Sequence, residues 1–318
     1  MDVTDAADQC AAVLDEVRGA VITDERFLRE VLTGVLARGH VLLEDVPGVG
    51  KTLTARSLAT ALGLEFSRVQ FTPDLLPADV TGSNVYDERD GTFAFVEGPI
   101  FANVVLADEI NRAPPKTQAA LLEAMEEGQV TVDGETHQLP EPFFVMATQN
   151  PVEQEGTFTL PEAQLDRFMV KSAMGYPDRA GELELVDRRA GRTTQTPSVE
   201  PVVDEATVAA LQSVPETVDV ERRLREYVVD LGRATREDDR VAVGVSPRGI
   251  QRLFEAARAR AVVEGREFVV ADDVKRMARP VLAHRLVLIA ESTVRSVERA
   301  EVLAAVLERV PVPTVDED

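Results

Sequence analysis

Residues 40–52 read HVLLEDVPGVGKT, and this stretch sets the expected fold. The apolar run at residues 40–44 is short and bounded by turn-forming residues, which predicts a buried strand. A glycine-containing loop follows it, and the apolar spacing at residues 52–62 predicts a helix. A buried strand that enters a helix in this way is typical of an α/β domain built on a parallel sheet.

The loop between this strand and helix matches a phosphate-binding pattern. Eight positions beginning at Asp45 fit G-x-x-x-x-G-K-[ST], except that aspartate stands where the first glycine is expected. Gly48 and Gly50 allow backbone N–H groups to curl around phosphates at a helix N-terminus, where the helix dipole favours anions. Lys51 would reach the β- and γ-phosphates, and Thr52 would ligate Mg²⁺. The alternative is a turn with a chance Lys-Thr pair, which the flanking strand and helix disfavour.

The pattern continues on the C-terminal side of this loop. Further strands are predicted at residues 66–71, 104–107, 143–148 and 168–174, and a second helix of the sheet region at residues 115–127. This alternation implies a parallel sheet with helices on both faces. Two β-hairpins interrupt it, at residues 84–101 and 129–139, because Asp90-Gly91 and Asp133-Gly134 are strong hairpin turns.

The chain is expected to divide into two domains and a tail. Residues 1–189 predict the α/β core with its two inserted hairpins, opening with helices from about Thr4 and after Thr23 or Asp24. Residues 190–203 are polar and predict a linker. Every segment of residues 204–310 reads as helical, which predicts a small all-α domain. Residues 311–318 are expected to be disordered.

Composition narrows the class of protein. The chain has 318 residues, of which 44% are hydrophobic, and no stretch approaches the roughly 20 apolar residues of a membrane-spanning helix. Acidic residues stand near the N-terminus, where a secretion signal is positively charged. A cytoplasmic protein is therefore expected. The single cysteine, Cys10, excludes a disulfide within the chain, and the three scattered histidines suggest no metal cluster.

The charge balance is strongly acidic. Asp and Glu number 56 against 34 Lys and Arg, a formal net charge of −22, and only four of the basic residues are lysines. Such self-repulsion loosens a fold in dilute buffer and is screened at high salt. We therefore interpret the chain as that of a salt-loving source. An ordinary acidic protein from a GC-rich genome is the alternative, but it explains the arginines and not the acid excess. An overall basic surface for nucleic acid is missing.

Several polar residues stand where strands end or helices begin. The apolar strand at residues 104–107 runs into Asp108 and Glu109, and such carboxylates can hold a Mg²⁺ shell and polarise an attacking water. Asn150 follows the strand at residues 143–148 and could position water, although an isolated asparagine more often forms a turn. Arg167 precedes the last strand, and Arg248 opens a helix of the second domain. Each arginine judged alone is more often a surface ion-pair member.

The order of these motifs resembles that of AAA+ ATPases, and the details resemble the MoxR family. The resemblance covers residues 19–305, and the stretches that carry it are LEDVPGVGKT (43–52), QFTPDLL (70–76), ADEINRAPPKTQ (107–118), ATQNP (147–151), EAQLDRF (162–168) and VSPR (245–248). It implies an AAA+ P-loop core, a parallel sheet flanked by helices, and a small helical lid. Members commonly carry aspartate at the position of Asp45, and both hairpins match insertions of this branch.

The resemblance also implies a role for each candidate residue. Lys51 and Thr52 belong to Walker A and Asp108 and Glu109 to Walker B, with Mg²⁺ at Thr52 and Asp108. Asn150 becomes sensor 1, Arg167 the arginine finger that reaches a neighbouring subunit, and Arg248 sensor 2. Residues 19–22 stand where adenine is cradled, and Gln70 could restrain Glu109 until a client binds. The implied ATP-binding residues are Val46, Pro47, Gly48, Val49, Gly50, Lys51, Thr52, Leu53 and Asp108.

The function that the resemblance implies is chaperone-like: ATP hydrolysis drives remodelling or maturation of a protein client, in a homo-oligomer expected to be a hexameric ring. Partners with a von Willebrand A domain are typical of the family. An ATPase subunit of a metal chelatase is one alternative, and a DNA-directed AAA+ motor is another. The hairpins disfavour DNA, because acidic residues dominate them and Arg89 is the only basic residue at either tip. A non-hydrolysing switch is disfavoured by Asp108 and Glu109.

Overall fold

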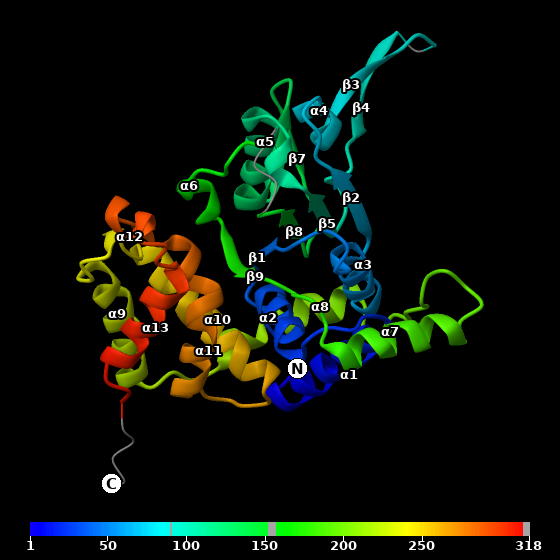
Figure 1. Cartoon of the computed structure of the whole chain (residues 1–318). Helices are drawn as coiled ribbons and strands as arrows, with labels where there is room; N and C mark the ends of the chain where they lie inside the picture. The colour runs from blue at the N-terminus through cyan, green and yellow to red at the C-terminus, as the bar shows by residue number, and fades with distance from the viewer. Residues whose placement is uncertain (90, 152–156, 314–318) are drawn as a thin grey trace.

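The computed structural model describes residues 1–89, 91–151 and 157–313, and it has the predicted α/β architecture. Five parallel strands form one sheet in the order β2-β5-β8-β1-β9, flanked by helices and followed by a helical lid (Figure 1). The strands are β1 (His40–Glu44), β2 (Phe66–Gln70), β5 (Val104–Asp108), β8 (Phe144–Gln149) and β9 (Phe168–Ser172). Each overlaps a strand predicted from the sequence, within two residues at either end.

Strand β1 lies inside the sheet, which explains its apolar sequence. It pairs with β8 on one side and with β9 on the other, so both of its edges are hydrogen-bonded. Leu42 and Leu43 point to opposite faces and are both fully buried. Because all strands are parallel, their C-terminal ends lie at one edge of the sheet. The loops that follow β1, β5 and β8 therefore meet there.

Helices cover the sheet, and helices also form the N-terminal part of the chain. They include α1 (Val3–Ala20), α2 (Glu25–Leu36), α3 (Lys51–Ala61), α4 (Pro77–Thr81), η1 (Ile110–Arg112), α5 (Pro115–Glu127), α6 (Glu162–Leu165) and α7 (Arg179–Gly191). The Asp24 carboxylate caps α2 as the sequence suggests. Helix α1 begins one residue before the expected Thr4, because the Asp2 side chain accepts from the Asp5 N–H and caps the helix there.

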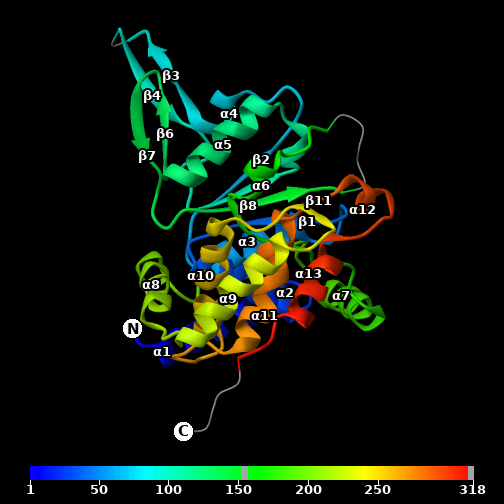
Figure 2. The same ribbon diagram turned by 90° about the vertical axis from the view of Figure 1, so that its left-hand side faces the viewer.

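The two hairpins project from one end of the molecule, away from the N-terminus (Figure 2). The first comprises β3 (Gly82–Asp87) and β4 (Thr92–Glu97), and the second β6 (Gln129–Val132) and β7 (Glu135–Gln138). The predicted turn residue Asp90 lies outside the described residues, whereas Asp133 and Gly134 form the second turn with φ of +51° and +88°. The Phe95 ring stacks on His137 at 3.8 Å, which joins the two hairpins.

The lid contains one feature that the sequence prediction missed. Its helical elements are α8 (Glu205–Leu211), η2 (Val214–Thr217), α9 (Arg222–Arg236), α10 (Pro247–Val263), α11 (Ala271–Leu282), η3 (Ala283–Arg285), α12 (Ala290–Val294) and α13 (Arg299–Arg309). The expectation of helix alone was wrong, because β10 (Val241–Val243) and β11 (Val287–Leu288) form an antiparallel pair. Strands this short leave no measurable period, and their pairing depends on residues more than 40 positions apart.

The proposed domain limits do not coincide with the secondary structure. Helix α7 ends at Gly191, inside the expected linker, and the Val202 N–H at its other end donates to the Ala61 carbonyl of α3. In the expected tail, the last five residues, 314–318, lie outside the described residues. No described helix is long and apolar enough to cross a membrane.

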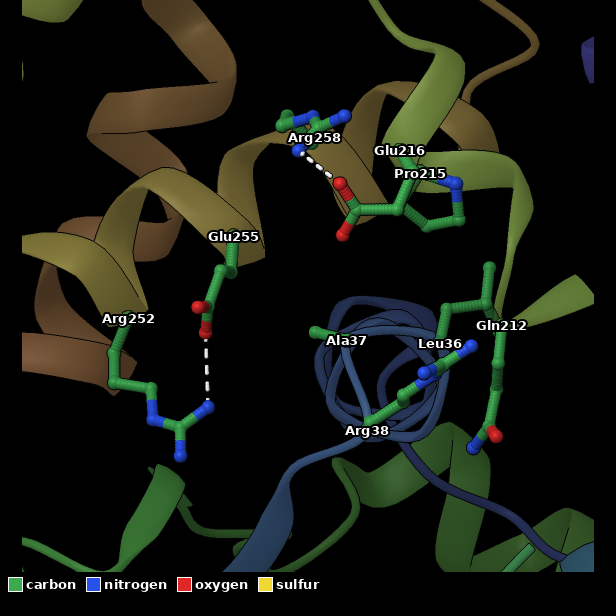
Figure 3. A pocket seen from close by; sticks show the side chains of 9 residues that line it. All are labelled: Leu36, Ala37, Arg38, Gln212, Pro215, Glu216, Arg252, Glu255 and Arg258. Atoms are coloured by element: carbon green, nitrogen blue, oxygen red, sulfur yellow. Dashed lines mark hydrogen bonds and ion pairs between the residues drawn. The ribbon is translucent and has the colours of Figure 1, made fainter.

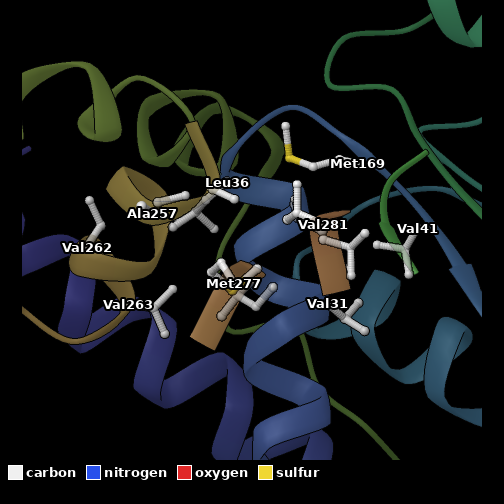
Figure 4. Close-up of a cluster of buried hydrophobic side chains, with 14 of the residues drawn as sticks. Val31, Leu36, Val41, Met169, Ala257, Val262, Val263, Met277 and Val281 are labelled. Atoms are coloured by element: carbon white, nitrogen blue, oxygen red, sulfur yellow. The ribbon is translucent and has the colours of Figure 1, made fainter. Parts of the chain in front are cut away.

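The lid shares a hydrophobic core with the α/β domain. Figure 4 shows Val31 and Leu36 of α2 among side chains of α10 and α11, including Met277 and Val281, with Met169 of β9 beside them. All of these side chains are at most 1% exposed. Burying several large apolar side chains between two units contributes about 1.5–3 kcal/mol each. The core therefore fixes the lid against the edge of the sheet formed by β9.

Candidate active site

The loop after β1 has the backbone of a phosphate cradle. Gly48 and Gly50 adopt φ of +88° and +104°, a region that residues with a side chain rarely occupy. Helix α3 begins directly after them at Lys51. The glycines therefore turn the chain tightly enough to point the N–H groups of the first helical turn, and the positive end of the dipole, into the loop.

Lys51 is held inside this loop. Its Nζ donates to the Asp45 carbonyl at 2.7 Å and to the Val46 carbonyl at 3.0 Å. Partial burial lowers the pKa of the Lys51 ammonium below its usual value, while the carboxylates of Asp45, Asp108 and Glu109 act to raise it. A phosphate would take the ammonium from two neutral carbonyls and offer it a charged acceptor.

Asp45 clamps the loop to the strand on its other side. Its carboxylate accepts from the N–H groups of Met174 at 2.6 Å and Gly175 at 2.9 Å, which follow β9, and from its neighbour Val46 at 3.1 Å. Asp45 is buried, so these bonds are shielded from water. An aspartate at this position therefore performs a task that the glycine of the general pattern cannot, because glycine has no acceptor to offer.

The end of β5 presents two carboxylates to the same loop. The Thr148 hydroxyl donates to Asp108 Oδ1 at 2.7 Å and accepts from the Glu109 N–H at 2.8 Å, which fixes both residues against β8. Arg68 donates to Asp108 Oδ2 through Nε at 3.1 Å and Nη2 at 2.6 Å. Glu109 has φ of +57°, a left-handed conformation that aims its side chain away from the direction of the strand.

Glu109 is restrained by neighbours on β2 and η1. Gln70 Nε2 donates to Glu109 Oε2 at 2.8 Å, and Arg112 Nε lies 3.2 Å from the same oxygen. The Gln70 amide is in turn fixed, because its Oε1 accepts from Arg68 Nη2 at 2.6 Å. Gln70, suggested by the sequence as a restraint on Glu109, makes that contact directly.

These residues surround one open cleft of about 400 Å³ at the C-terminal ends of the strands. Its lining residues are Pro47, Gly48, Gly50, Lys51, Thr52, Leu53, Arg68, Gln70, Asp108, Glu109, Thr148, Gln149 and Asn150. The cleft thus gathers most of the predicted nucleotide-binding residues, with Asn150 buried in its wall. The predicted Val46 and Val49 belong to the loop but do not line the cleft. Residues 19–22, expected to cradle adenine, are not among the residues that line the cleft, and the Gly19 carbonyl accepts from Arg188 of α7.

Arg167 and Arg248 lie away from this cleft. Arg167 immediately precedes β9, beside the start of β1, since Phe168 pairs with His40. The phosphate-binding loop follows the other end of β1, about 16 Å away at roughly 3.3 Å per residue. Arg248 stands in the first turn of α10, whose N-cap Ser246 accepts from the Gly249 N–H. Both arginines contact Glu126 of α5.

A second hollow, of about 160 Å³, is lined by arginines together with carboxylates (Figure 3). It lies between the end of α2, the segment around η2, and α10. Two of its arginines are engaged by carboxylates within the hollow: Arg258 pairs with Glu216 at 2.8 Å, and Arg252 with Glu255 at 2.9 Å. The cleft at the glycine loop is therefore the stronger candidate for a nucleotide.

Three functional features escaped the sequence analysis. Arg68 stands two positions before Gln70 on β2, so the alternation of the strand places both on one face, a signal that was available. The other two features are the clamp formed by Asp45 and the Glu126 carboxylate, which contacts Arg167 and Arg248. Neither gave such a signal. Their partners lie more than 40 positions away, so only the tertiary structure brings them together.

Known proteins resemble the chain over nearly its whole length. Residues 40–170 match the family described as "ATPase family associated with various cellular activities (AAA)", and residues 233–305 match the AAA lid domain. The protein YeaC of Bacillus subtilis is 49% identical over 89% of this chain and 88% of its own length. Chaperone MoxR1 of Mycobacterium tuberculosis is 41% identical, over 95% and 81%. The crystal structure of a putative ATPase from Cytophaga hutchinsonii has a TM-score of 0.91 and 38% identity, covering 98% and 97%.

Proposed function

The chain belongs to the MoxR family of AAA ATPases, and from that premise we propose that it hydrolyses ATP in a ring of subunits to remodel or mature a protein client. The P-loop ATPase activity follows from the family. The residue roles, the shared sites and the client are the proposal. The position of Arg167, a full strand length from the phosphate-binding loop of its own chain, carries the proposal of shared sites.

ATP binds at the glycine loop with its phosphates against the first turn of α3. Lys51 leaves its two carbonyl partners and bonds to the β- and γ-phosphates. Thr52 and Asp108 line the same cleft, and a hydroxyl and a carboxylate suit Mg²⁺, which prefers oxygen ligands. A Mg²⁺ ion held by these two residues would supply positive charge to the phosphates. Asp108 Oδ2 accepts from Arg68, so Asp108 would have to exchange that bond to hold the metal.

Glu109 accepts the proton of the attacking water, and Asn150 orients that water. Glu109 is presently engaged by Gln70 and Arg112, so its carboxylate must be released before it can act. This arrangement supports a restraint that client binding relieves. General-base assistance of this kind contributes about 10²- to 10⁴-fold in rate.

Each active site is completed by a second copy of the chain. Arg167 cannot reach its own cleft, because the β9 strand separates it from the loop, whereas a neighbouring subunit can receive it. An arginine supplied in trans contributes on the order of 10³- to 10⁵-fold in related systems. Its planar fork matches the oxygens of a phosphoryl group in the transition state.

Subunit mixing tests the shared site. Arg167→Ala and Lys51→Ala should each be inactive alone, and their mixture should recover part of the activity, since some interfaces pair an intact loop with an intact arginine. Arg248 stands beside Arg167, so Arg248→Ala should complement Lys51→Ala in the same way. A mixture that co-assembles yet stays inactive would refute the shared site.

A protein client fits the hairpins better than DNA does. The first hairpin carries exposed apolar side chains on both of its faces, Val85 and Val96 on one and Tyr86 and Phe93 on the other. The name of the chaperone relative is consistent with a protein client. A von Willebrand A protein encoded beside this chain should stimulate ATP hydrolysis, and duplex DNA should not. Stimulation by DNA alone would favour the motor function instead.

A further inference from the structure

One carboxylate joins the core of the protein to its lid. Glu126, near the end of α5, forms an ion pair with Arg167 Nη2 at 3.3 Å through Oε2 and accepts from Arg248 Nη1 at 2.9 Å through Oε1. Arg167 belongs to the core and Arg248 to the lid. The two guanidiniums therefore converge on a single negative charge, with one oxygen for each.

Glu126 does not stabilise the helix to which it belongs. Glu126 lies in the last turn of α5, which ends at Glu127, and a negative charge there opposes the helix dipole. The three side chains are also only partly buried, with exposed fractions of 35% for Glu126, 29% for Arg167 and 39% for Arg248. The position of the Glu126 carboxylate between the two guanidiniums is thus an anion site that is accessible from solvent.

A buried arginine fixes the backbone beneath both guanidiniums. Arg285 of η3 donates to Asp166 Oδ1 at 2.7 Å and to the carbonyls of Asp166 at 3.0 Å and Phe168 at 2.8 Å, the residues on either side of Arg167. Its side chain also packs on Gly249, where a Cβ would lie 3.0 Å from Arg285 Cδ. The Arg285 side chain is 2% exposed, so water does not compete for these bonds.

In the proposed shared site Arg167 and Arg248 both meet the terminal phosphate of a nucleotide bound to a second copy of the chain, and we propose that Glu126 is an internal anion that holds these two arginines until the phosphate displaces it. The inference rests on the proposed shared site and adds a positioning residue to it. A phosphate carries more charge than a carboxylate and accepts bidentate bonds from both guanidiniums, so the exchange is favourable. Glu126 thereby weakens the assembly of subunits whose neighbours hold no nucleotide.

The test uses the full chain with Glu109→Gln, so that bound ATP persists. Sedimentation velocity with ATP and Mg²⁺ gives the protein concentration at half-assembly, with and without Glu126→Gln. Removing the competing charge should lower that concentration by about 2- to 30-fold, the range expected for two partly exposed ion pairs. Glu127→Gln removes the same charge one residue further on and should leave the concentration nearly unchanged.

Two further measurements separate the exchange from a structural effect. Without nucleotide, Glu126→Gln should give no gain in assembly, and adding Arg248→Ala should abolish the gain seen with ATP. A structural ion pair alone predicts a lower melting temperature and assembly that is equal or weaker. If Glu126→Gln unfolds, Glu126→Asp keeps the charge on a shorter side chain and should give a smaller gain.

The outcomes are distinct. Assembly of Glu126→Gln no stronger than that of Glu127→Gln, or a gain that appears without nucleotide, overturns this inference and leaves the shared site standing. If the Glu109→Gln protein with ATP does not assemble at any accessible concentration, the shared site itself fails, and this inference fails with it.

Discussion

Replacing Asp45 with glycine restores the general phosphate-loop pattern, and we expect it to damage the protein. The Asp45 carboxylate is buried and accepts from the N–H groups of Met174, Gly175 and Val46. The first two bonds tie the loop to the segment after β9. In Asp45→Gly these two N–H groups lose their acceptor. Glycine also gives the unfolded chain more backbone freedom and leaves the start of the loop less constrained.

The expected loss of stability is large for one side chain. A hydrogen bond to a charged group contributes about 1.5–3 kcal/mol net, and the added backbone entropy of glycine costs up to about 1 kcal/mol. Water can partly replace the lost acceptor at the Gly175 N–H, which is at the less buried end. We therefore expect Asp45→Gly to lower the free energy of unfolding by about 3–5 kcal/mol. Asp45→Asn keeps one acceptor oxygen and should lose roughly half as much.

Urea unfolding and titration with a fluorescent ATP analogue measure the two consequences. Binding should also weaken on the order of tenfold, because ordering a looser loop consumes about 1.4 kcal/mol of binding free energy. Thr54→Ser serves as a control that perturbs α3 beside Met174 without touching the clamp. Asp45→Gly that unfolds at wild-type urea concentrations and binds the analogue equally well would refute the role of the clamp.

Three other perturbations have defined outcomes. Glu109→Gln should bind ATP but hydrolyse it about 10²- to 10⁴-fold more slowly, whereas Lys51→Ala should lose nucleotide affinity; near-normal turnover of the first variant in a phosphate-release assay contradicts our assignment. Burial lowers the pKa of His40 to about 4. Between about pH 6.5 and about pH 4 the imidazole therefore takes up a proton only in the unfolded chain. The free energy of unfolding, measured by urea titration, should fall by up to about 1.4 kcal/mol for each pH unit across that range. His40→Gln should reduce that slope without abolishing it, because burial also lowers the pKa of His284. Raising KCl from about 0.1 M to roughly 2 M should raise the melting temperature, and a flat response removes the salt-loving interpretation.

The sequence determined the elements and the chemistry of the cleft. The apolar run of β1, the glycines after it and the carboxylates after β5 are local patterns, and each is fixed by residues adjacent in the chain. The glycine loop and the carboxylates after a buried strand were enough to predict that Lys51 and Asp108 belong to one site, whereas the place of Asn150 in it was implied by the family resemblance. Likewise, Asp133-Gly134 specified its hairpin through backbone conformation alone.

Only the tertiary structure decided how the two halves of the chain engage each other. The clamp of Asp45 joins residues 129 positions apart, and the ion pair of Arg248 with Glu126 joins residues 122 positions apart. Neither contact follows from periodicity, because the spacing of apolar residues predicts which positions are buried but not which partner a charged side chain meets. The contact between Arg248 and Glu126 depends on the packing of α10 and α11 against α2 and β9, a core whose apolar residues specify burial but not which charges it brings together.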